Sequence, residues 1–465
     1  MEDGQILAGG INSEYLSIID ENPELNTLVE ETDSQSNVEE SSISSKILSK
    51  LSRGYTFYTV STIIAYSLNE IGFILPYFLK IIGIVPYFLA LVFSSIISLY
   101  IFYIQIDIVI KLNLFKDYHD ILNGNLGHKF NLVYYILNII YHTLILILEI
   151  SIITQFFLKL LSFFDIDANG KYIYSLIIIL SLILIQFPFS FINYLKKPDF
   201  LFNVFISLFI LLNIVSSIFF LVYKIRSNNK NNEENVQISS INFFENISPD
   251  YFVCFSAFIN IIGWQNQLSR QLEGFKIKTT QRFFNIIYLT LILMFILCLI
   301  TGFINSPLMK DNEENKYKIN IFLLEYNNEI IPSLMIIIEV IIFIFFINIL
   351  IAYRISLIEE NFILSLKATI YRKKEPSFPP NKIIISLFKI FILLLASFIN
   401  LLIKDMSCII ILFGGIFASI LNFYYPTIIY SKLISRNSLV NRIAWVLSLL
   451  VIILNIIGFV LKIIF

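Results

Sequence analysis

Several stretches of this chain are too long and too apolar to be exposed to water. Four of them run for 24 or more residues without Asp, Glu, Lys or Arg: Ile81–Ile106, Phe200–Tyr223, Phe283–Met309 and Met406–Ser431. About 20 mostly apolar residues are enough for a helix to cross a bilayer. Charged residues make up 14% of the chain, against about 25% in a typical globular protein. The sequence therefore excludes a soluble multidomain protein and predicts a polytopic membrane protein.

Eleven segments have the length and composition of membrane-spanning helices. They lie at 56–80, 84–110, 131–160, 172–192, 200–223, 250–269, 283–305, 331–353, 383–403, 407–431 and 443–463. We therefore expect an all-α, multi-pass integral membrane protein with about 11 transmembrane helices.

The charges divide the chain into an acidic tail and a basic body. Residues 1–50 hold eleven acidic side chains against two lysines, so we expect a disordered cytoplasmic tail. With the N-terminus in the cytoplasm, the inner segments carry 21 Lys and Arg residues and the outer segments carry 10. The inner count includes Arg354, which directly follows the eighth expected span. The positive-inside rule predicts a cytoplasmic N-terminus and an outside or lumenal C-terminus.

Residues that build catalytic or metal centres are few and scattered. Cys254, Cys298 and Cys408 all lie in apolar segments, without the spacing of a disulfide framework or of metal ligands. The three histidines form no metal motif, and no phosphate-binding loop, catalytic triad or redox motif occurs. We therefore expect no enzyme, no metal, no cofactor and no nucleic-acid partner.

The first expected span is interrupted at its centre. Asn69, Glu70, Ile71 and Gly72 stand where an ordinary span stays apolar, and Pro76 follows. A charge at the bilayer midplane costs several kcal/mol, so by default it faces a cavity. Transporters use such broken helices to bind substrates with free backbone groups. The alternative is a proline-kinked helix whose glutamate pairs with a neighbour.

The sixth span offers a counterpart to this break. Phe258, Asn260, Gly263 and Trp264 place polar and small residues within an otherwise apolar segment. Two interrupted segments, first in each half of the chain, indicate a binding site between inverted repeats. The alternative is the amphipathic end of a helix, because the polar residues lead into the basic loop at Arg270.

The two breaks suggest a division of the chain into repeats. We expect repeat A, with helices 1–5, at 54–223, an outside loop at 224–249, and repeat B, with helices 6–10, at 250–431. An eleventh helix at 443–465 then stands outside the five-plus-five inverted repeat.

The third span carries a polar stripe. Tyr135, His142 and Glu149 are seven residues apart and share one helix face, which we expect to point into the bundle. This stripe is a candidate for proton relay, since His142 can titrate near neutral pH. The alternative is hydrogen bonding that holds neighbouring helices together. Near the inner end of the ninth span, we expect Lys389 to extend to the cytoplasmic interface.

The order of short motifs resembles that of the amino acid/auxin permease family. The matching stretches are Leu75-Pro76-Tyr77 followed by Gly83, Asp117-Tyr118 followed by Gly127, Phe187-Pro188-Phe189-Ser190, Trp264-Gln265-Asn266 followed by Glu273, and Asn422 through Pro426. This resemblance implies the broken-helix, inverted-repeat (LeuT-type) fold. It also implies a secondary-active amino acid transporter that works by alternating access, with H⁺ or Na⁺ as the coupling ion.

The chain departs from the family pattern at both breaks. Glu70 lies where the family has a Gly-x-Gly stretch, and Trp264 replaces a histidine. A charged break favours a cationic substrate or proton coupling through Glu70, with His142 and Glu149 as further candidates. We expect the substrate carboxylate near Glu70–Gly72 and its ammonium near Asn260–Gly263.

Two other functions remain open from the sequence. The acidic, serine-rich tail suits an amino acid sensor or scaffold that signals after phosphorylation. A carrier of another small organic solute would use the same fold. In each case the partners are the lipid bilayer and a small molecule, in a plasma membrane or a vacuolar or lysosome-like membrane.

Overall fold

A computed structural model describes the membrane-embedded body of the chain. It describes residues 59–61, 63–64, 67, 72, 74–111, 127–162, 248–263, 280–306, 330–370, 382–402, 406–434 and 438–464, with six single positions between 214 and 243. The chain divides into two units, Met1–Phe57 and Tyr58–Phe465, and every described residue belongs to the second. The expected acidic tail and the spans at 172–192 and 200–223 lie wholly or largely outside the described residues. The domain boundaries expected from the sequence stay a prediction.

The described part of the chain is helical throughout. Its helices are α4 (Leu75–Ile82), α5 (Ile84–Lys111), α7 (His128–Ser162), α10 (Asp250–Ile262), α12 (Thr280–Asn305), α13 (Ile330–Ile370), α14 (Lys382–Leu402), α15 (Ser407–Ile410), the π-helical segments η7 (Ile411–Phe417) and η8 (Ile420–Tyr424), α16 (Tyr425–Leu433) and α17 (Leu439–Ile464). The four elements from α15 to α16 form one span. Seven described spans are long and apolar enough to cross a membrane, and α10 is a shorter apolar helix. The prediction of an all-α, multi-pass membrane protein is confirmed.

The eighth span differs from the expectation. The sequence predicted that it ends at residue 353, with Arg354 in a cytoplasmic segment. The structure instead continues α13 to Ile370, and Arg354 is 3% exposed inside it. The reason is that Glu149 of α7 pairs with this arginine, so the charge does not end the helix.

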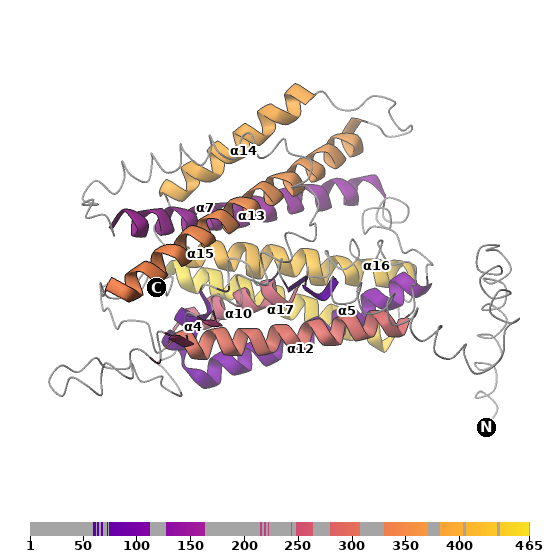
Figure 1. Cartoon of the computed structure of the whole chain (residues 1–465). Helices are drawn as coiled ribbons and strands as arrows, with labels where there is room; N and C mark the ends of the chain where they lie inside the picture. The colour runs from indigo at the N-terminus through magenta and orange to yellow at the C-terminus, as the bar shows by residue number, and fades with distance from the viewer. Residues whose placement is uncertain are drawn as a thin grey trace, which may run out of the picture. The chain divides into compact units, whose positions relative to one another are not determined.

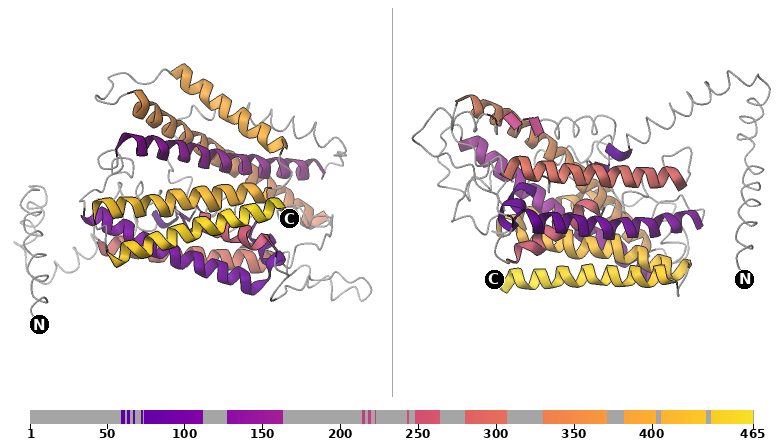
Figure 2. Two further views of the ribbon diagram at one scale, coloured as in Figure 1. Left: turned by 180° about the vertical axis from the view of Figure 1, so that it is seen from behind. Right: turned by 90° about the horizontal axis from the view of Figure 1, so that it is seen from below.

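The helices form two groups of neighbours. In the first group α7 packs against both α13 and α14, and the rings of Phe156 and Phe343 lie 5.7 Å apart at the α7–α13 contact. In the second group α10 packs against α4, α5, η7 and α17, while α12 packs against α4 and α5. Figure 1 and the left view of Figure 2 place α7, α13 and α14 together on one side of the remaining helices.

The two predicted breaks are present. Helical residues at 59–61, 63–64 and 67 precede Gly72, which lies in a 3₁₀ turn, and α4 begins only at Leu75. Pro76 stands in the first turn of α4, where a missing N–H is tolerated. The sixth span stops at Ile262, with Gly263 as its C-cap residue.

Gly83 separates α4 from α5. Its φ angle is 86°, a conformation that glycine adopts without steric penalty. The backbone can therefore leave α4 and enter α5 within one residue, as the motif match at Gly83 suggested.

Candidate functional site

Two helix ends of opposite polarity lie at the breaks: the N-terminus of α4 and the C-terminus of α10. The N-terminus of α4 has no side-chain cap, and the last carbonyl groups of α10 have no partner within their own helix. A helix N-terminus attracts an anion and a helix C-terminus attracts a cation, each by about 0.3–1 kcal/mol. Since α4 and α10 also contact each other, the pair suits a small molecule that carries both charges.

On the α4 side the structure describes one of the four predicted site residues. Gly72 is half-buried, and a Cβ atom built on it meets no described atom within 4 Å. Its backbone therefore borders open space among the described residues. Asn69, Glu70 and Ile71 lie outside the described residues.

On the α10 side three predicted residues are described. Asn260 is half-buried one turn before the end of the helix, and Gly263 is buried at the end itself. Phe258 is fully buried, and its ring lies 5.0 Å from that of Tyr87 on α5, so this side chain anchors α10. Trp264 lies outside the described residues.

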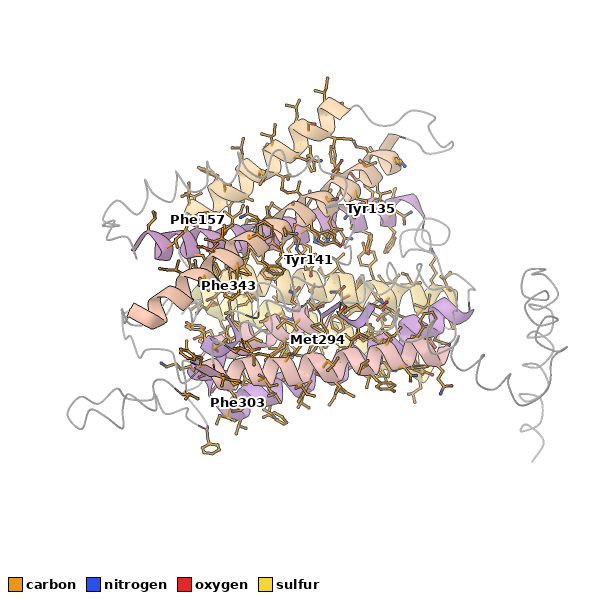
Figure 3. The ribbon with its side chains drawn as sticks, viewed as in Figure 1. Tyr135, Tyr141, Phe157, Met294, Phe303 and Phe343 are labelled. Carbon is orange, nitrogen blue, oxygen red and sulfur yellow. The ribbon has the colours of Figure 1, made fainter. Side chains whose placement is uncertain are left out.

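The structure adds a residue that sequence reasoning missed. The hydroxyl of Tyr141 on α7 donates a hydrogen bond of 2.7 Å to Oδ1 of Asn260. Figure 3 labels Tyr141 where α7 approaches the second group of helices. This bond connects the two groups at the end of α10. The only sequence signal was its position directly before His142, on a different face from the predicted stripe.

The predicted stripe on α7 is buried, as expected. Tyr135, His142 and Glu149 are 1%, 8% and 0% exposed. Tyr135 packs beside Tyr134, with ring centroids 5.9 Å apart. The remaining two residues of the stripe face α13.

His142 and Glu149 meet at Arg354, which the sequence placed in a loop. Arg354 Nε donates to Glu149 Oε1 at 3.2 Å, and Arg354 Nη1 lies 3.5 Å from His142 Nδ1. The arrangement is a buried Arg354–Glu149 ion pair with the imidazole of His142 beside it. Proton coupling by His142 or Glu149 stays a prediction.

Metal-binding and disulfide chemistry have no centre in the described residues. Within them no three His, Cys, Asp or Glu side chains are grouped as metal ligands. Cys254 and Cys298 are buried free thiols, and Cys408 is a half-buried one.

Comparison with solved structures shows which fold the chain shares. A manganese transporter of Eremococcus coleocola, solved as a point mutant, aligns with a TM-score of 0.50 and 11% identity, over 87% of this chain and 85% of that one. A Na⁺-coupled sialic acid symporter aligns with a TM-score of 0.49 and 13% identity, over 89% of this chain and 90% of that one. The likeness to the manganese transporter concerns the fold alone, which is the LeuT type that the family resemblance implied.

Sequence comparison identifies the family. None of the curated proteins compared with the chain matches it. The family model described as "Transmembrane amino acid transporter protein" matches residues 53–465, which is nearly the whole membrane body. The chain therefore belongs to the transmembrane amino acid transporter family and is a membrane transporter.

Proposed function

We propose that the protein is a secondary-active transporter of amino acids that works by alternating access. The observation that carries the proposal is that α4 and α10, which contact each other, each have one end at a break, and that Asn260 near the end of α10 bonds to Tyr141. An amino acid carries a carboxylate and an ammonium group within one small molecule. The helix ends offer a complementary charge to each of them.

The carboxylate is expected at the α4 side. The backbone N–H groups of the first turn of α4 are hydrogen-bond donors without a side-chain cap, and among the described residues no atom lies within 4 Å of a Cβ built on Gly72. The ammonium is expected at the carbonyl groups that end α10, between Asn260 and Gly263. The substrate side chain then extends toward Tyr141, whose hydroxyl already contacts Asn260.

Alternating access would alter the contact between the two groups of helices. The Tyr141–Asn260 bond joins α7 of the first group to α10 of the second. If the second group rocks against the first, this bond breaks and re-forms once in each cycle. A neutral hydrogen bond contributes only about 0.5–1.5 kcal/mol, so this exchange is energetically accessible.

For coupling we favour Glu70, with H⁺ as the ion and Na⁺ as the alternative. Glu149 already has the Arg354 guanidinium as a counter-charge, and His142 lies beside the same arginine. Binding a proton at Glu149 would leave that arginine buried without its counter-charge, which is energetically costly. Glu70 belongs to the break itself, so a change in its charge would act next to the expected substrate carboxylate.

Uptake into proteoliposomes tests this proposal. Purified protein is reconstituted, and uptake of labelled neutral and cationic amino acids is measured under a pH gradient, a Na⁺ gradient or neither. Saturable uptake that a pH gradient accelerates is the expected result. No saturable uptake of any amino acid under any gradient would contradict the proposal.

The role of Glu70 is tested in the same vesicles. Glu70→Gln is expected to make uptake insensitive to pH, and to weaken uptake of Lys or Arg more than that of neutral substrates. Glu360→Gln on α13, away from both breaks, is the matched control and should keep the pH dependence. An equal pH response in the Glu70 variant and the parent would reject the role of Glu70.

A further inference from the structure

The eleventh helix carries polar residues that a lipid-facing helix would not need. Most of α17 is apolar, but Asn455 near its middle is 0% exposed and Lys462 stands in its last turn. Polar residues inside membrane spans are costly and therefore face a partner. Both residues contact α10, the half-helix that ends at the proposed substrate site.

The first contact lies at the middle of α17. The hydroxyl oxygen of Ser256 on α10 lies 2.5 Å from Oδ1 of Asn455. The same oxygen lies 2.7 Å from the carbonyl oxygen of Phe252. The amide nitrogen of Asn455 donates to the carbonyl of Val451 at 2.8 Å and lies 3.4 Å from the hydroxyl of Ser419. Asn455 therefore connects α10, η7–η8 and α17 in one buried network.

Two further contacts follow the same pair of helices toward the end predicted to face outside. Gly458 lies against Phe252 so closely that an added Cβ would come within 2.7 Å of the ring atom Cγ. At the end of the pair, Lys462 Nζ lies 2.8 Å from Asp250 Oδ1. The three contacts follow one another along both helices in antiparallel order, so they fix the register of α10 on α17.

The π-helical segment η7 packs closely against the same face of α10. A Cβ added to Gly414 would lie 2.8 Å from the carbonyl oxygen of Ser256 and 3.3 Å from Cβ of Asn260. One added to Gly415 would lie 2.7 Å from the hydroxyl of Ser256. The α10 face that carries Ser256 and Asn260 is therefore enclosed by η7 and α17.

Ser256 and Asn260 are four residues apart, so they lie one above the other on α10. A contact that fixes the position of Ser256 therefore also fixes the position of Asn260. The amide oxygen of Asn260 accepts the hydrogen bond from Tyr141 at the proposed substrate site. The polar connection thus runs from Asn455 through α10 to α7. On the α17 side this connection consists of several buried contacts. On the α7 side it consists of one half-buried hydrogen bond.

We propose that α17 holds α10 as one rigid unit throughout the transport cycle, and that Asn455 is the positioning residue that sets the place of Asn260. This inference rests on the proposed function, because it assigns the moving contact of that cycle to the α7 side of α10. The eleventh helix, which stands outside the inverted repeat, then serves as the anchor of the broken sixth helix.

Cross-linking tests the rigid unit. In a parent whose three native cysteines are replaced by alanine, Asp250→Cys and Lys462→Cys are joined by a short bifunctional thiol reagent. Cross-linked protein is expected to keep its uptake rate within about twofold. Each single-cysteine variant, treated with the same reagent, controls for modification alone. Loss of uptake on cross-linking that a reductant reverses would overturn the proposal.

The same variant gives a readout that needs no transport. The rate of cross-linking is expected to be the same with and without an imposed gradient, and with and without added amino acid. A rate that changes with these conditions would overturn the rigid unit. If neither the cysteine-free parent nor the unsubstituted protein takes up any amino acid, the proposed function is wrong. The cross-linking rate then still decides whether α17 and α10 form a rigid unit.

A double-mutant cycle tests the positioning role. Ser256→Ala and Asn455→Leu are each expected to raise KM about fivefold, with Vmax per folded transporter unchanged. The double variant is expected to be no worse than the worse single variant, because both act on one contact. A lower yield of folded protein with unchanged KM, or fully additive effects on KM, would overturn the role of Asn455.

Discussion

Two adjacent residues of α7, Tyr141 and His142, face two regions with different polar contacts. Tyr141 meets α10 at a helix end, through a neutral hydrogen bond to a half-buried amide. His142 meets α13 at an ion pair between two residues that are 0% and 3% exposed. The α7–α13 region therefore holds buried charge, whereas the α7–α10 region holds neutral groups beside free helix ends.

The difference teaches which contacts a transporter can break. Separating two buried charges leaves each without its partner, at several kcal/mol per ion. Separating a neutral hydrogen bond costs about 1 kcal/mol. The ion pair joins two helices of the same group, and the neutral bond joins helices of different groups. Of these two polar contacts, a rocking motion between the groups thus breaks the weaker one.

The largest effect is expected at the ion pair. Arg354→Met alone leaves Glu149 buried and unpaired, and should lower the free energy of unfolding by about 3–5 kcal/mol. Replacing both residues, by Arg354→Met with Glu149→Leu, should recover most of that loss. Thermal unfolding of the purified protein in detergent measures both effects.

This first prediction has a clear contrary outcome. If the double variant unfolds as early as the single one, the pair does more than neutralise charge within the first group. The α7–α13 contact could then not be described as a static region whose charges only neutralise each other, in contrast to a moving, neutral α7–α10 contact.

The breaks themselves were readable from the sequence, because they depend on local chemistry. Gly72 and Pro76 weaken a helix wherever they occur, and so does Gly263, three residues after Asn260. The structure accordingly starts α4 at Leu75 and ends α10 at Ile262. The family resemblance, carried by motifs at these breaks, is confirmed by the family match over residues 53–465.

The side-chain pairs that join different helices could not be predicted from the sequence, because their members lie far apart in the chain. Arg354 follows a long apolar run, so a local pattern ends the helix there. Its partner Glu149 is 205 residues away. Tyr141 is likewise 119 residues from Asn260, and nothing in its surroundings distinguishes it from the other tyrosines of the span. The π-helical form of η7 also left no sequence signal beyond two adjacent glycines.

Lys389 shows the same limit on a smaller scale. The sequence predicted that it extends to the cytoplasmic interface. In the structure Lys389 Nζ lies 2.7 Å from Oε2 of Glu359 on α13, and the residue is 5% exposed. An acid on a neighbouring helix was close enough to pair, which a rule based on depth alone does not consider.

An intermediate effect is therefore expected at Lys389. Lys389→Met should lower the free energy of unfolding by about 1–2 kcal/mol, between the values for exposed and for fully buried pairs. Glu359 is 13% exposed and can be hydrated once the lysine is gone. Unfolding in detergent, compared with Arg354→Met, measures the difference. A loss equal to that of Arg354→Met would show that all charges of the first group are equally constrained.

The smallest effect on stability, and the most informative for transport, is expected at Tyr141. Tyr141→Phe removes one neutral hydrogen bond and leaves the ring in place. It should shift unfolding by about 1 kcal/mol or less while raising KM about fivefold, since Asn260 loses the donor that orients it. Tyr103→Phe on α5, whose residue is 48% exposed, is the matched control and should change neither quantity. An unchanged KM in the Tyr141 variant, with the same pH response as the parent, would place the substrate away from the α7–α10 contact. The α7–α10 contact would then take no part in substrate binding, and the α4 side of the site would bind the substrate alone.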